Sequence, residues 1–321
     1  MSEPAISDAG RSNEASIAVL VPCHNEASSV ARVVEDFRSA LPNAVVYVYD
    51  NNSSDDTADR ARAAGAIVRA ESRPGKGNVV RRMFADIDAD VYVLVDGDAT
   101  YDAGAALGMV KQLLDDDLDM VVGTRAPVPD DDEVYRRGHD TGNRVFNRVL
   151  RVLFGSHFTD VFSGYRAMTR RFVKSFPARS SGFEIETEIT AHAVDIDAPC
   201  AEVLTTYGSR GDESESKLRT YHDGFRILMV ALLLFKEMRP MRFFSILALG
   251  LTVVAWGLAL PILIEYAETG LVPRFPTAIL AAAIQIVALV CLTSGIVLDS
   301  VCRLRRDTKR LTYLGIARHR P

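Results

Sequence analysis

Two carboxylates separated by one residue, Asp96 and Asp98, follow directly on the apolar run Val91–Val95. If the β-strand conformation continues to Asp98, the alternation of side chains along a strand points both carboxylates to the same face. Two hard oxygen ligands at one point suit Mg²⁺ or Mn²⁺, which takes one or two carboxylates together with substrate phosphates. Such a metal would bridge a diphosphate and offset charge on a departing nucleotide. A turn with two solvated acids is the alternative.

Polar clusters also follow the first two apolar runs. The first run ends in PCHNE at residues 22–26, and the second ends in DNNSSDDT at residues 50–57. Both clusters open helical patterns, so helix N-capping explains much of the second one. Capping does not require an acid at the end of the strand itself. A carboxylate at Asp50 could accept hydrogen bonds from the N–H edge of a nucleobase, which would give base selectivity.

A lysine flanked by glycines, Gly75-Lys76-Gly77, follows the third run and opens a further helical pattern. Glycines permit close approach of the backbone, and a helix N-terminus favours anions. Lys76 could therefore neutralise a phosphate. The spacing is not that of a Walker loop, and a plain turn would account for the same residues.

These clusters lie between alternating structural patterns from residue 17 to about residue 206. The predicted strands are Ile17–Val21, Val45–Tyr49, Ala66–Val68, Val91–Val95 and Met120–Val122, and the predicted helices are Val30–Leu41, Thr57–Ala64, Val79–Asp86 and Ala105–Leu114. Strands that alternate with helices predict an α/β domain with a mostly parallel sheet covered on both faces. Ligands bind beyond the carboxyl ends of such strands, where the polar clusters fall.

Two uncharged apolar stretches follow, Phe243–Ile264 and Thr277–Leu298. Each is long enough to cross a bilayer core of ~30 Å at ~1.5 Å per residue. Two in succession predict a transmembrane hairpin instead of a buried helix of a soluble domain. Basic residues flank both outer ends, whereas the link Glu265–Arg274 has a single arginine. The positive-inside rule then predicts a two-span protein of the cell membrane, with the catalytic domain and both termini cytoplasmic.

The segment Asp223–Glu237 is apolar but too short to span. Since it adjoins the first span, it predicts an interfacial helix, with a core helix of the soluble domain as the alternative. The N-terminus lacks the basic start and apolar stretch of a secretory signal. We expect five parts: a disordered tail at 1–16, the catalytic domain at 17–222, an interfacial helix and linker at 223–242, the hairpin at 243–298, and a basic cytoplasmic tail at 299–321.

Composition argues against several other functions. A net charge of -5 over 321 residues disfavours a general nucleic-acid binder. The four cysteines lie far apart, which indicates neither a zinc site nor a disulfide framework and fits a reducing compartment. No serine or cysteine motif of nucleophilic catalysis accompanies the histidines.

The ordered set VPCHNE, DNNSSDDT, GKGN and DGDAT resembles the family-2 inverting glycosyltransferases, which have the Rossmann-like GT-A fold. The later elements VGTR at 122–125, SGYR at 163–166 and FEIE at 183–186 are similar to the branch that glycosylates polyprenyl phosphates, including dolichol-phosphate mannose synthase and GtrB-like enzymes. The resemblance covers residues 17 to 217, and the membrane hairpin fits it. The family often has R-x-x-G-x-S-K where this chain reads RGDESESK at 210–217, so Lys217 matches less well than Arg210.

The resemblance implies transfer of a monosaccharide from a UDP- or GDP-linked donor to undecaprenyl, decaprenyl or dolichyl phosphate, with Mg²⁺ or Mn²⁺ held by Asp96 and Asp98. The implied nucleotide-sugar site consists of Pro22, Asn25, Glu26, Asp50, Asn52, Lys76, Asp96 and Gly97. The implied catalytic residues are Asp98, Asp160 and Arg125, and the implied acceptor-phosphate residues are Arg166, Arg210 and Lys217.

The acceptor determines how much base catalysis is needed. A sugar hydroxyl needs a general base, whereas a phosphate monoester has a second pKa of about 6 and is largely ionised already. Catalysis would then depend on the metal, cationic side chains and in-line positioning. Asp160 is the candidate base by its position just before SGYR; orienting an arginine or a metal-bound group is the alternative.

Two other functions are compatible with parts of the sequence. A processive polysaccharide synthase, or another family-2 enzyme with a non-lipid acceptor, would share the DxD element. A processive synthase would normally carry Q-x-x-R-W and more spans, whereas the one tryptophan here, Trp256, lies inside the first span. A catalytically inactive membrane scaffold would not need Asp96, Asp98 and the Gly75–Gly77 loop intact. The sugar, the polyprenol length and any homo-oligomer are left open by the sequence.

Overall fold

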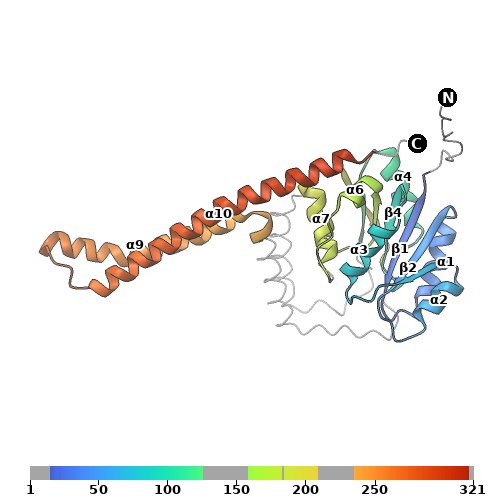
Figure 1. Cartoon of the computed structure of the whole chain (residues 1–321), viewed down its shortest axis with the longest axis horizontal. Helices are drawn as coiled ribbons and strands as arrows, with labels where there is room; N and C mark the ends of the chain where they lie inside the picture. The colour runs from blue at the N-terminus through green and yellow to red at the C-terminus, as the bar shows by residue number, and fades with distance from the viewer. Residues whose placement is uncertain (1–14, 126–157, 183, 209–234, 318–321) are drawn as a thin grey trace, which may run out of the picture. The chain divides into compact units, whose positions relative to one another are not determined.

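The computed structural model describes residues 15–125, 158–182, 184–208 and 235–317 (Figure 1). The chain divides into two compact units. The first, called the catalytic unit below, comprises residues 1–135, 156–217 and 309–321, and the second comprises residues 136–155 and 218–308. Each unit is described by itself.

The catalytic unit is built on a seven-stranded sheet with the order β3-β2-β1-β4-β6-β5-β7. The strands are β1 Ile17–Cys23, β2 Ala44–Asp50, β3 Ile67–Ala70, β4 Val91–Leu94, β5 Met120–Arg125, β6 Arg166–Thr169 and β7 Cys200–Thr205. All neighbouring pairs are parallel except those of β6, which runs antiparallel to both β4 and β5. The mostly parallel sheet predicted from the sequence is confirmed.

Helices cover both faces of this sheet. They are α1 Val30–Ala40, α2 Thr57–Ala63, α3 Lys76–Asp86, α4 Ala105–Asp115, α6 Arg170–Ser175 and α7 Ile185–Asp195. Helix α1 contacts α2 and α4, whereas α3 contacts α6 and α7. Alternate residues of each strand serve the two layers: Val19 and Val93 belong to the core with α1 and α4, while the Tyr92 ring packs edge-on against Phe84 of α3. Because both faces of the sheet are buried, the sequences of the central strands are continuous apolar runs without alternating polar residues.

The strand order places the polar clusters together. Strand β1 lies between β2 and β4, so the chain leaves β1 toward β2 and β3 and then returns to its other side as β4. Such a reversal leaves a crevice at the carboxyl ends of the strands, which is where open α/β sheets bind ligands. The register pairs Cys23 with Asp50 and Leu20 with Leu94, so the clusters after β1, β2 and β4 all fall at this one edge.

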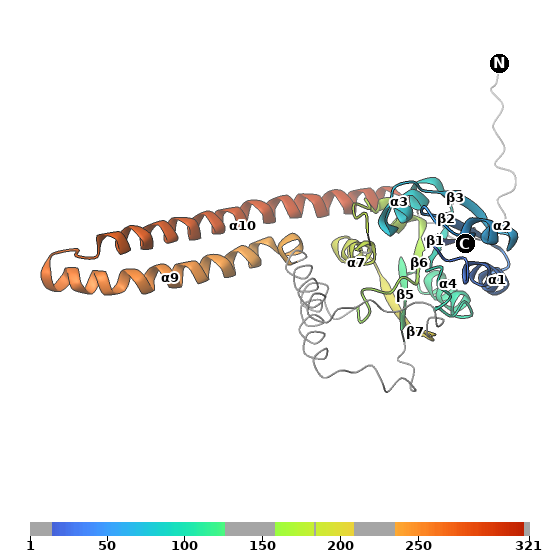
Figure 2. The same cartoon turned by 90° about the horizontal axis from the view of Figure 1, so that it is seen from below.

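The second unit contains α9 Pro240–Thr269 and α10 Phe275–Gly315 up to Thr308, two long helices that lie side by side in both views (Figures 1 and 2). Both are long and apolar enough to cross a membrane, which confirms the two predicted apolar helices. Their contact face repeats every seven residues with small or buried side chains: Ala248, Ala255 and Ile262 on α9, and Ala281, Ala288 and Gly295 on α10. Small residues at such an interface let helix backbones approach closely.

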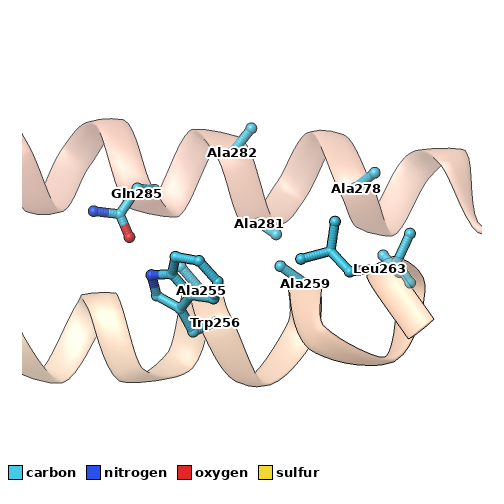
Figure 3. Close-up of a pocket in the computed structure, with 9 residues that line it drawn as sticks. Ala255, Trp256, Ala259, Leu263, Ala278, Ala281, Ala282 and Gln285 are labelled. Atoms are coloured by element: carbon cyan, nitrogen blue, oxygen red, sulfur yellow. The ribbon is translucent and has the colours of Figure 1, made fainter. Parts of the chain in front are cut away.

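The small side chains also leave space between the helices. A cavity of about 420 Å³ lies there, lined mainly by alanines together with Trp256, Leu263 and Gln285 (Figure 3). The Gln285 side chain donates to Thr252 Oγ1 across the helix pair at 3.5 Å.

The C-terminal segment differs from the sequence prediction. We expected a basic tail from residue 299, but α10 continues to Gly315, and its residues from Lys309 onward belong to the catalytic unit. Lys309 Nζ lies 2.8 Å from Asp195 Oδ2, and the Tyr313 hydroxyl donates to the buried carboxylate of Asp119. Lys309 is thus paired with an acid of the catalytic unit and largely buried, instead of lying in a solvated tail. Most of the predicted interfacial helix, residues 223–234, lies outside the described residues.

Candidate active site

The two acids of the DGD element have different surroundings. Strand β4 ends at Leu94, so Asp96 and Asp98 lie in a turn beyond the strand. Ala99 has a φ of 57°, and this left-handed residue closes the turn. Asp98 Oδ1 accepts hydrogen bonds from the Thr100 hydroxyl at 2.6 Å and from the Thr100 N–H at 3.2 Å. Asp96 instead pairs with Lys76. The turn, not strand alternation, orients the two carboxylates.

Two glycines allow this turn to pack closely. A Cβ on Gly97 would lie 2.6 Å from Cys23 Sγ, and a Cβ on Gly164 would lie 2.6 Å from Asp96 Oδ2. The Gly97 carbonyl accepts a hydrogen bond of 2.7 Å from the Ser29 hydroxyl, which ties the turn to the start of α1. Gly97 was expected in the nucleotide-sugar site; its contacts show a packing role in holding the acids in place.

The carboxylate at the end of β2 has one oxygen without a partner. Asp50 Oδ2 accepts from the Ser53 N–H at 3.3 Å, while Oδ1 is buried and has no hydrogen-bond partner among the described residues. A buried acceptor left unpaired costs about 1–3 kcal/mol, so such groups usually meet a ligand or water. The vacant oxygen suits the N–H edge of a nucleobase, in line with the expectation for Asp50.

Asn51, which the sequence analysis did not single out, joins the loop after β2 to the loop between β3 and α3. Its Nδ2 donates to the carbonyls of Glu71 at 2.8 Å and Arg73 at 2.7 Å, and its Oδ1 accepts from the Gly75 N–H at 2.7 Å. The side chain is buried. An asparagine directly after a strand was the available signal. Asn52, the residue expected to contact the donor, is exposed at a φ of 58° and donates to the Ser72 carbonyl.

The cluster after β1 is hydrogen-bonded to the cluster after β2. Asn25 Oδ1 accepts from the Ser54 N–H at 2.8 Å, and the Glu26 N–H donates to Thr57 Oγ1 at 2.8 Å. Pro22 is buried within β1 itself. The structure thus brings Asn25 and Glu26 to the same edge as Asp50, while Pro22 supports them from the strand.

The glycine-lysine loop begins α3 and approaches the segment before α7. Gly75 has a φ of 113°, and a Cβ there would lie 2.1 Å from the Ser181 carbonyl oxygen. A Cβ on Gly77 would lie 2.3 Å from the Ser180 carbonyl oxygen. Both positions therefore require glycine, for backbone conformation at Gly75 and for close approach at both.

Lys76 lies between two carboxylates. Its Nζ pairs with Asp96 and, at 2.5 Å, with Glu186 Oε1 of α7. Burial by itself would lower the pKa of Lys76, but the charges and hydrogen bonds of Asp96 and Glu186 outweigh it and raise that pKa. Lys76 therefore carries its positive charge beside the DGD turn at neutral pH. The sequence analysis quoted FEIE without assigning a role to Glu186.

Arg125 and Asp160 form a bidentate ion pair. Arg125 Nε lies 2.7 Å from Asp160 Oδ2, and its second nitrogen lies 2.8 Å from Oδ1. Burial would raise the pKa of Asp160, but the hydrogen bonds and charge of Arg125 outweigh burial and lower it. A carboxylate with a lowered pKa is a weak base. Of the two roles left open for Asp160, the geometry favours orienting an arginine.

Arg166 is not available to an acceptor phosphate. Its side chain is fully buried, and its guanidinium donates to the carbonyls of Ser163 and Val161 and to Thr190 Oγ1 of α7. Those bonds hold the SGYR segment against α7, so the expected phosphate contact is replaced by a structural role. The other two residues expected at the acceptor, Arg210 and Lys217, lie outside the described residues.

Comparison with known proteins identifies the family. The sequence model described as Glycosyl transferase family 2 matches residues 18–176. Glycosyltransferase AglJ of Haloferax volcanii is 32% identical over 300 residues, which cover 93% of this chain and 98% of AglJ. The chain belongs to glycosyl transferase family 2. A second relative in the same organism, a dolichyl-phosphate hexose transferase, is 29% identical over 157 residues, covering 49% of this chain and 68% of that protein.

A solved structure supports the GT-A fold of this family 2 glycosyltransferase. Glucosyl-3-phosphoglycerate synthase from Mycobacterium tuberculosis, in complex with Mn²⁺, UDP-glucose and phosphoglyceric acid, superimposes with a TM-score of 0.54 at 24% sequence identity. The match covers 69% of this chain and 79% of that one. At this identity the likeness establishes the fold alone.

Two acids of the family 2 site, Asp96 and Asp98, could ligate a divalent cation together with a substrate phosphate. Among the described residues no group of three or more histidines, cysteines and acids could hold a metal alone. Asp96 and Asp98 would supply carboxylate oxygens, and a donor diphosphate would supply the rest, which is how Mg²⁺ commonly binds. When bound, the cation would offset charge on the departing diphosphate. Asp50 would hold the base, and the Arg125–Asp160 pair would present a fixed guanidinium.

Proposed function

We propose that this family 2 glycosyltransferase transfers a monosaccharide from a nucleotide-sugar to a polyprenyl phosphate. The observation that carries the proposal is the Arg125–Asp160 ion pair, in which both carboxylate oxygens are engaged at 2.7 and 2.8 Å. A hydroxyl acceptor would need a free base at this point. A phosphate acceptor needs none, because its oxygen is already ionised at neutral pH.

The two apolar helices in the same chain support a lipid-linked acceptor. A polyprenyl phosphate keeps its tail in the bilayer, so an enzyme that uses it benefits from a membrane anchor. The related dolichyl-phosphate hexose transferase of Haloferax volcanii points to the same acceptor class. Arg210 and Lys217 remain our candidates for holding the acceptor phosphate, on the strength of the family resemblance.

In the proposed reaction, one oxygen of the acceptor phosphate attacks the anomeric carbon of the sugar. The bond from that carbon to the β-phosphate oxygen breaks, its electron pair leaves with the nucleoside diphosphate, and the anomeric configuration inverts. Lys76, which pairs with Asp96, and Arg125, which pairs with Asp160, would supply positive charge as negative charge develops on the diphosphate. The mycobacterial synthase was crystallised with Mn²⁺ and UDP-glucose, which supports a divalent cation and a UDP-linked donor here, with a GDP-linked donor the alternative.

A comparison of acceptors tests the proposal. The purified full chain in lipid nanodiscs would be incubated with Mn²⁺, a panel of UDP- and GDP-sugars, and one of three acceptors: a polyprenyl phosphate, the matching polyprenol, or soluble 3-phosphoglycerate. We expect a polyprenyl-phosphate-linked monosaccharide by mass spectrometry, together with one equivalent of nucleoside diphosphate. Transfer to the polyprenol or to 3-phosphoglycerate alone would refute the proposed acceptor. Release of a nucleoside monophosphate would instead indicate a sugar-phosphate transferase.

A further inference from the structure

Three charged side chains, those of Lys76, Asp96 and Glu186, form a largely buried cluster beside the DGD turn. Lys76 is 10% exposed, and its ammonium contacts Asp96 on one side and Glu186 on the other. Glu186 is 4% exposed, and its Oε2 is buried without a hydrogen-bond partner among the described residues. Because one of its oxygens is unused, Glu186 has the capacity to bind Lys76 more fully than it does here.

The pairing with Asp96 conflicts with the binding of a cation. Asp96 is one of the two acids that fit Mg²⁺ or Mn²⁺, and its Oδ1 is engaged by Lys76. A divalent cation at that carboxylate would lie within a few ångströms of the ammonium, where like charges repel strongly in a partly buried site. We therefore expect a bound cation to weaken the Lys76–Asp96 pair, and the second carboxylate that Lys76 contacts among the described residues is Glu186.

We propose that Lys76 is a movable counter-charge and that Glu186 is the positioning residue that receives it when a cation binds Asp96. Without a donor, Lys76 neutralises Asp96 and excludes free cations. When a cation arrives with a nucleotide diphosphate, Lys76 moves to both oxygens of Glu186 and keeps one N–H for a phosphate oxygen. Cation binding is thereby coupled to nucleotide binding.

The cluster is well placed for this exchange. Glu186 lies on α7, and its backbone carbonyl accepts the hydroxyl of Thr190, which in turn accepts a hydrogen bond from Arg166. The buried guanidinium of Arg166 also interacts electrostatically with Glu186, so this carboxylate is held between two cations. The inference rests on the proposed metal-dependent function, but it concerns metal binding and not the identity of the acceptor.

Direct measurement of Mn²⁺ binding tests the exchange. The electron paramagnetic resonance signal of free Mn²⁺ would be titrated with purified full-length protein, first alone and then with UDP or GDP. In the wild type we expect weak binding of Mn²⁺ alone and at least about tenfold tighter binding with the matching nucleotide, since close charge pairs couple by more than about 1.4 kcal/mol.

Two variants should shift Mn²⁺ binding in opposite directions. Lys76→Met removes the positive charge that competes with the cation, so Mn²⁺ alone should bind about tenfold more tightly. Added nucleotide should then raise the affinity for Mn²⁺ by a smaller factor than in the wild type. Glu186→Gln leaves Asp96 as the one carboxylate that Lys76 contacts among the described residues, so Mn²⁺ should bind more weakly with and without nucleotide. Lys76→Arg keeps the charge and should keep free Mn²⁺ excluded. Glu35→Gln, on the exposed side of α1, makes the same charge change as Glu186→Gln and should match the wild type.

A purely structural Glu186 would give a different pattern. Both Lys76→Met and Glu186→Gln would then lower the thermal midpoint and weaken Mn²⁺ binding together, and that result would overturn the proposal. If Glu186→Gln fails to fold, the Lys76→Met titration decides alone: unchanged or weaker binding of free Mn²⁺ refutes the exchange. The expected Mn²⁺ pattern without transfer to polyprenyl phosphate would refute the proposed acceptor and leave this inference standing.

Discussion

Gly164 lies against Asp96 so closely that its lack of a side chain controls the position of the acid. A Cβ at Gly164 would lie 2.6 Å from Asp96 Oδ2. We expect Gly164→Ala to displace the carboxylate and to lower kcat/KM by about 100-fold, because misplacement by about 1 Å can cost that much. Gly108→Ala on α4 is the matched control, since nothing lies within 4 Å of its Cβ position. Steady-state kinetics would check both variants; equal activity of the two would show that Asp96 tolerates the shift.

Asp98 is oriented by Thr100, whose hydroxyl and N–H both donate to Oδ1, and it is one of the two acids proposed to ligate the metal. We expect Asp98→Ala to abolish turnover while the thermal midpoint of the purified protein changes little, because the side chain is only partly buried. The measurement is nucleotide release with and without a chelator. A variant that retains full activity in chelator would rule out the metal site at this turn.

At the scale of elements, α7 meets α6 through a buried histidine. His192 Nε2 lies 3.0 Å from Ser175 Oγ, and its ring packs against Phe172 and Phe176 with centroids 5.1 and 5.3 Å away. Burial, with a smaller contribution from the charge of Lys309, lowers the pKa of His192 to about 3. The folded protein therefore keeps this imidazole neutral under conditions in which the unfolded chain protonates it.

The direction of the pH effect follows from that difference. The unfolded pKa is about 6.5, so the unfolded state takes up a proton first as the pH falls, and stability is lost from about pH 6.5 downward towards the folded pKa. Between pH 7 and pH 5 we expect the loss from this group to be about 2 kcal/mol. Thermal melts of the wild type and His192→Gln over this range would test it, because glutamine can still bond Ser175 but does not titrate. If the thermal midpoints of the two proteins fall in parallel as the pH is lowered, the pH dependence does not come from His192.

The last turns of α10 belong to the catalytic unit through Tyr313. Its hydroxyl donates to Asp119, which is fully buried, and Arg171 lies over its ring at 4.1 Å. Because Asp119 also accepts from Thr169 and Arg171, Tyr313→Phe should cost only about 1 kcal/mol, or roughly 2–4 °C in thermal midpoint. Tyr266→Phe, at an exposed position on α9, is the control. A midpoint equal to that of the control would mean that the Tyr313 contact does not stabilise the catalytic unit.

At the scale of the whole molecule, the orientation in the membrane stays a prediction from the basic flanks. The positive-inside rule places the catalytic unit with the cytoplasmic nucleotide-sugars and exports only the link between the two spans. A cysteine probe at Thr269, next to the left-handed Gly270 that ends α9, should be labelled from outside intact cells, and a probe at Arg320 should not. Labelling with a membrane-impermeant maleimide gives the readout. The reverse pattern would overturn the predicted orientation, and with it the prediction that the nucleotide-sugar donor is cytoplasmic.

Local sequence patterns were sufficient for the parts of the fold that depend on neighbouring residues. The apolar runs that became β1, β2 and β4 place Asp50, Asp96 and Asp98 at one sheet edge, because parallel strands end on the same side. The two apolar helices followed in the same way from length and the lack of charge. The antiparallel β6 was not predicted, since four residues give too short a pattern and its direction depends on pairing with β4 and β5.

Only the tertiary structure decided which charged residues meet. Lys76 and Glu186 are far apart in sequence, and their pairing requires α3 and α7 to pack on the same side of the sheet. The family resemblance implied that Arg166 binds a phosphate, yet β6 carries it into the core, where backbone carbonyls accept its hydrogen bonds. A sequence specifies the kind of charge at each position, but burial and pairing depend on elements brought together across the fold, and these decide what each charge does.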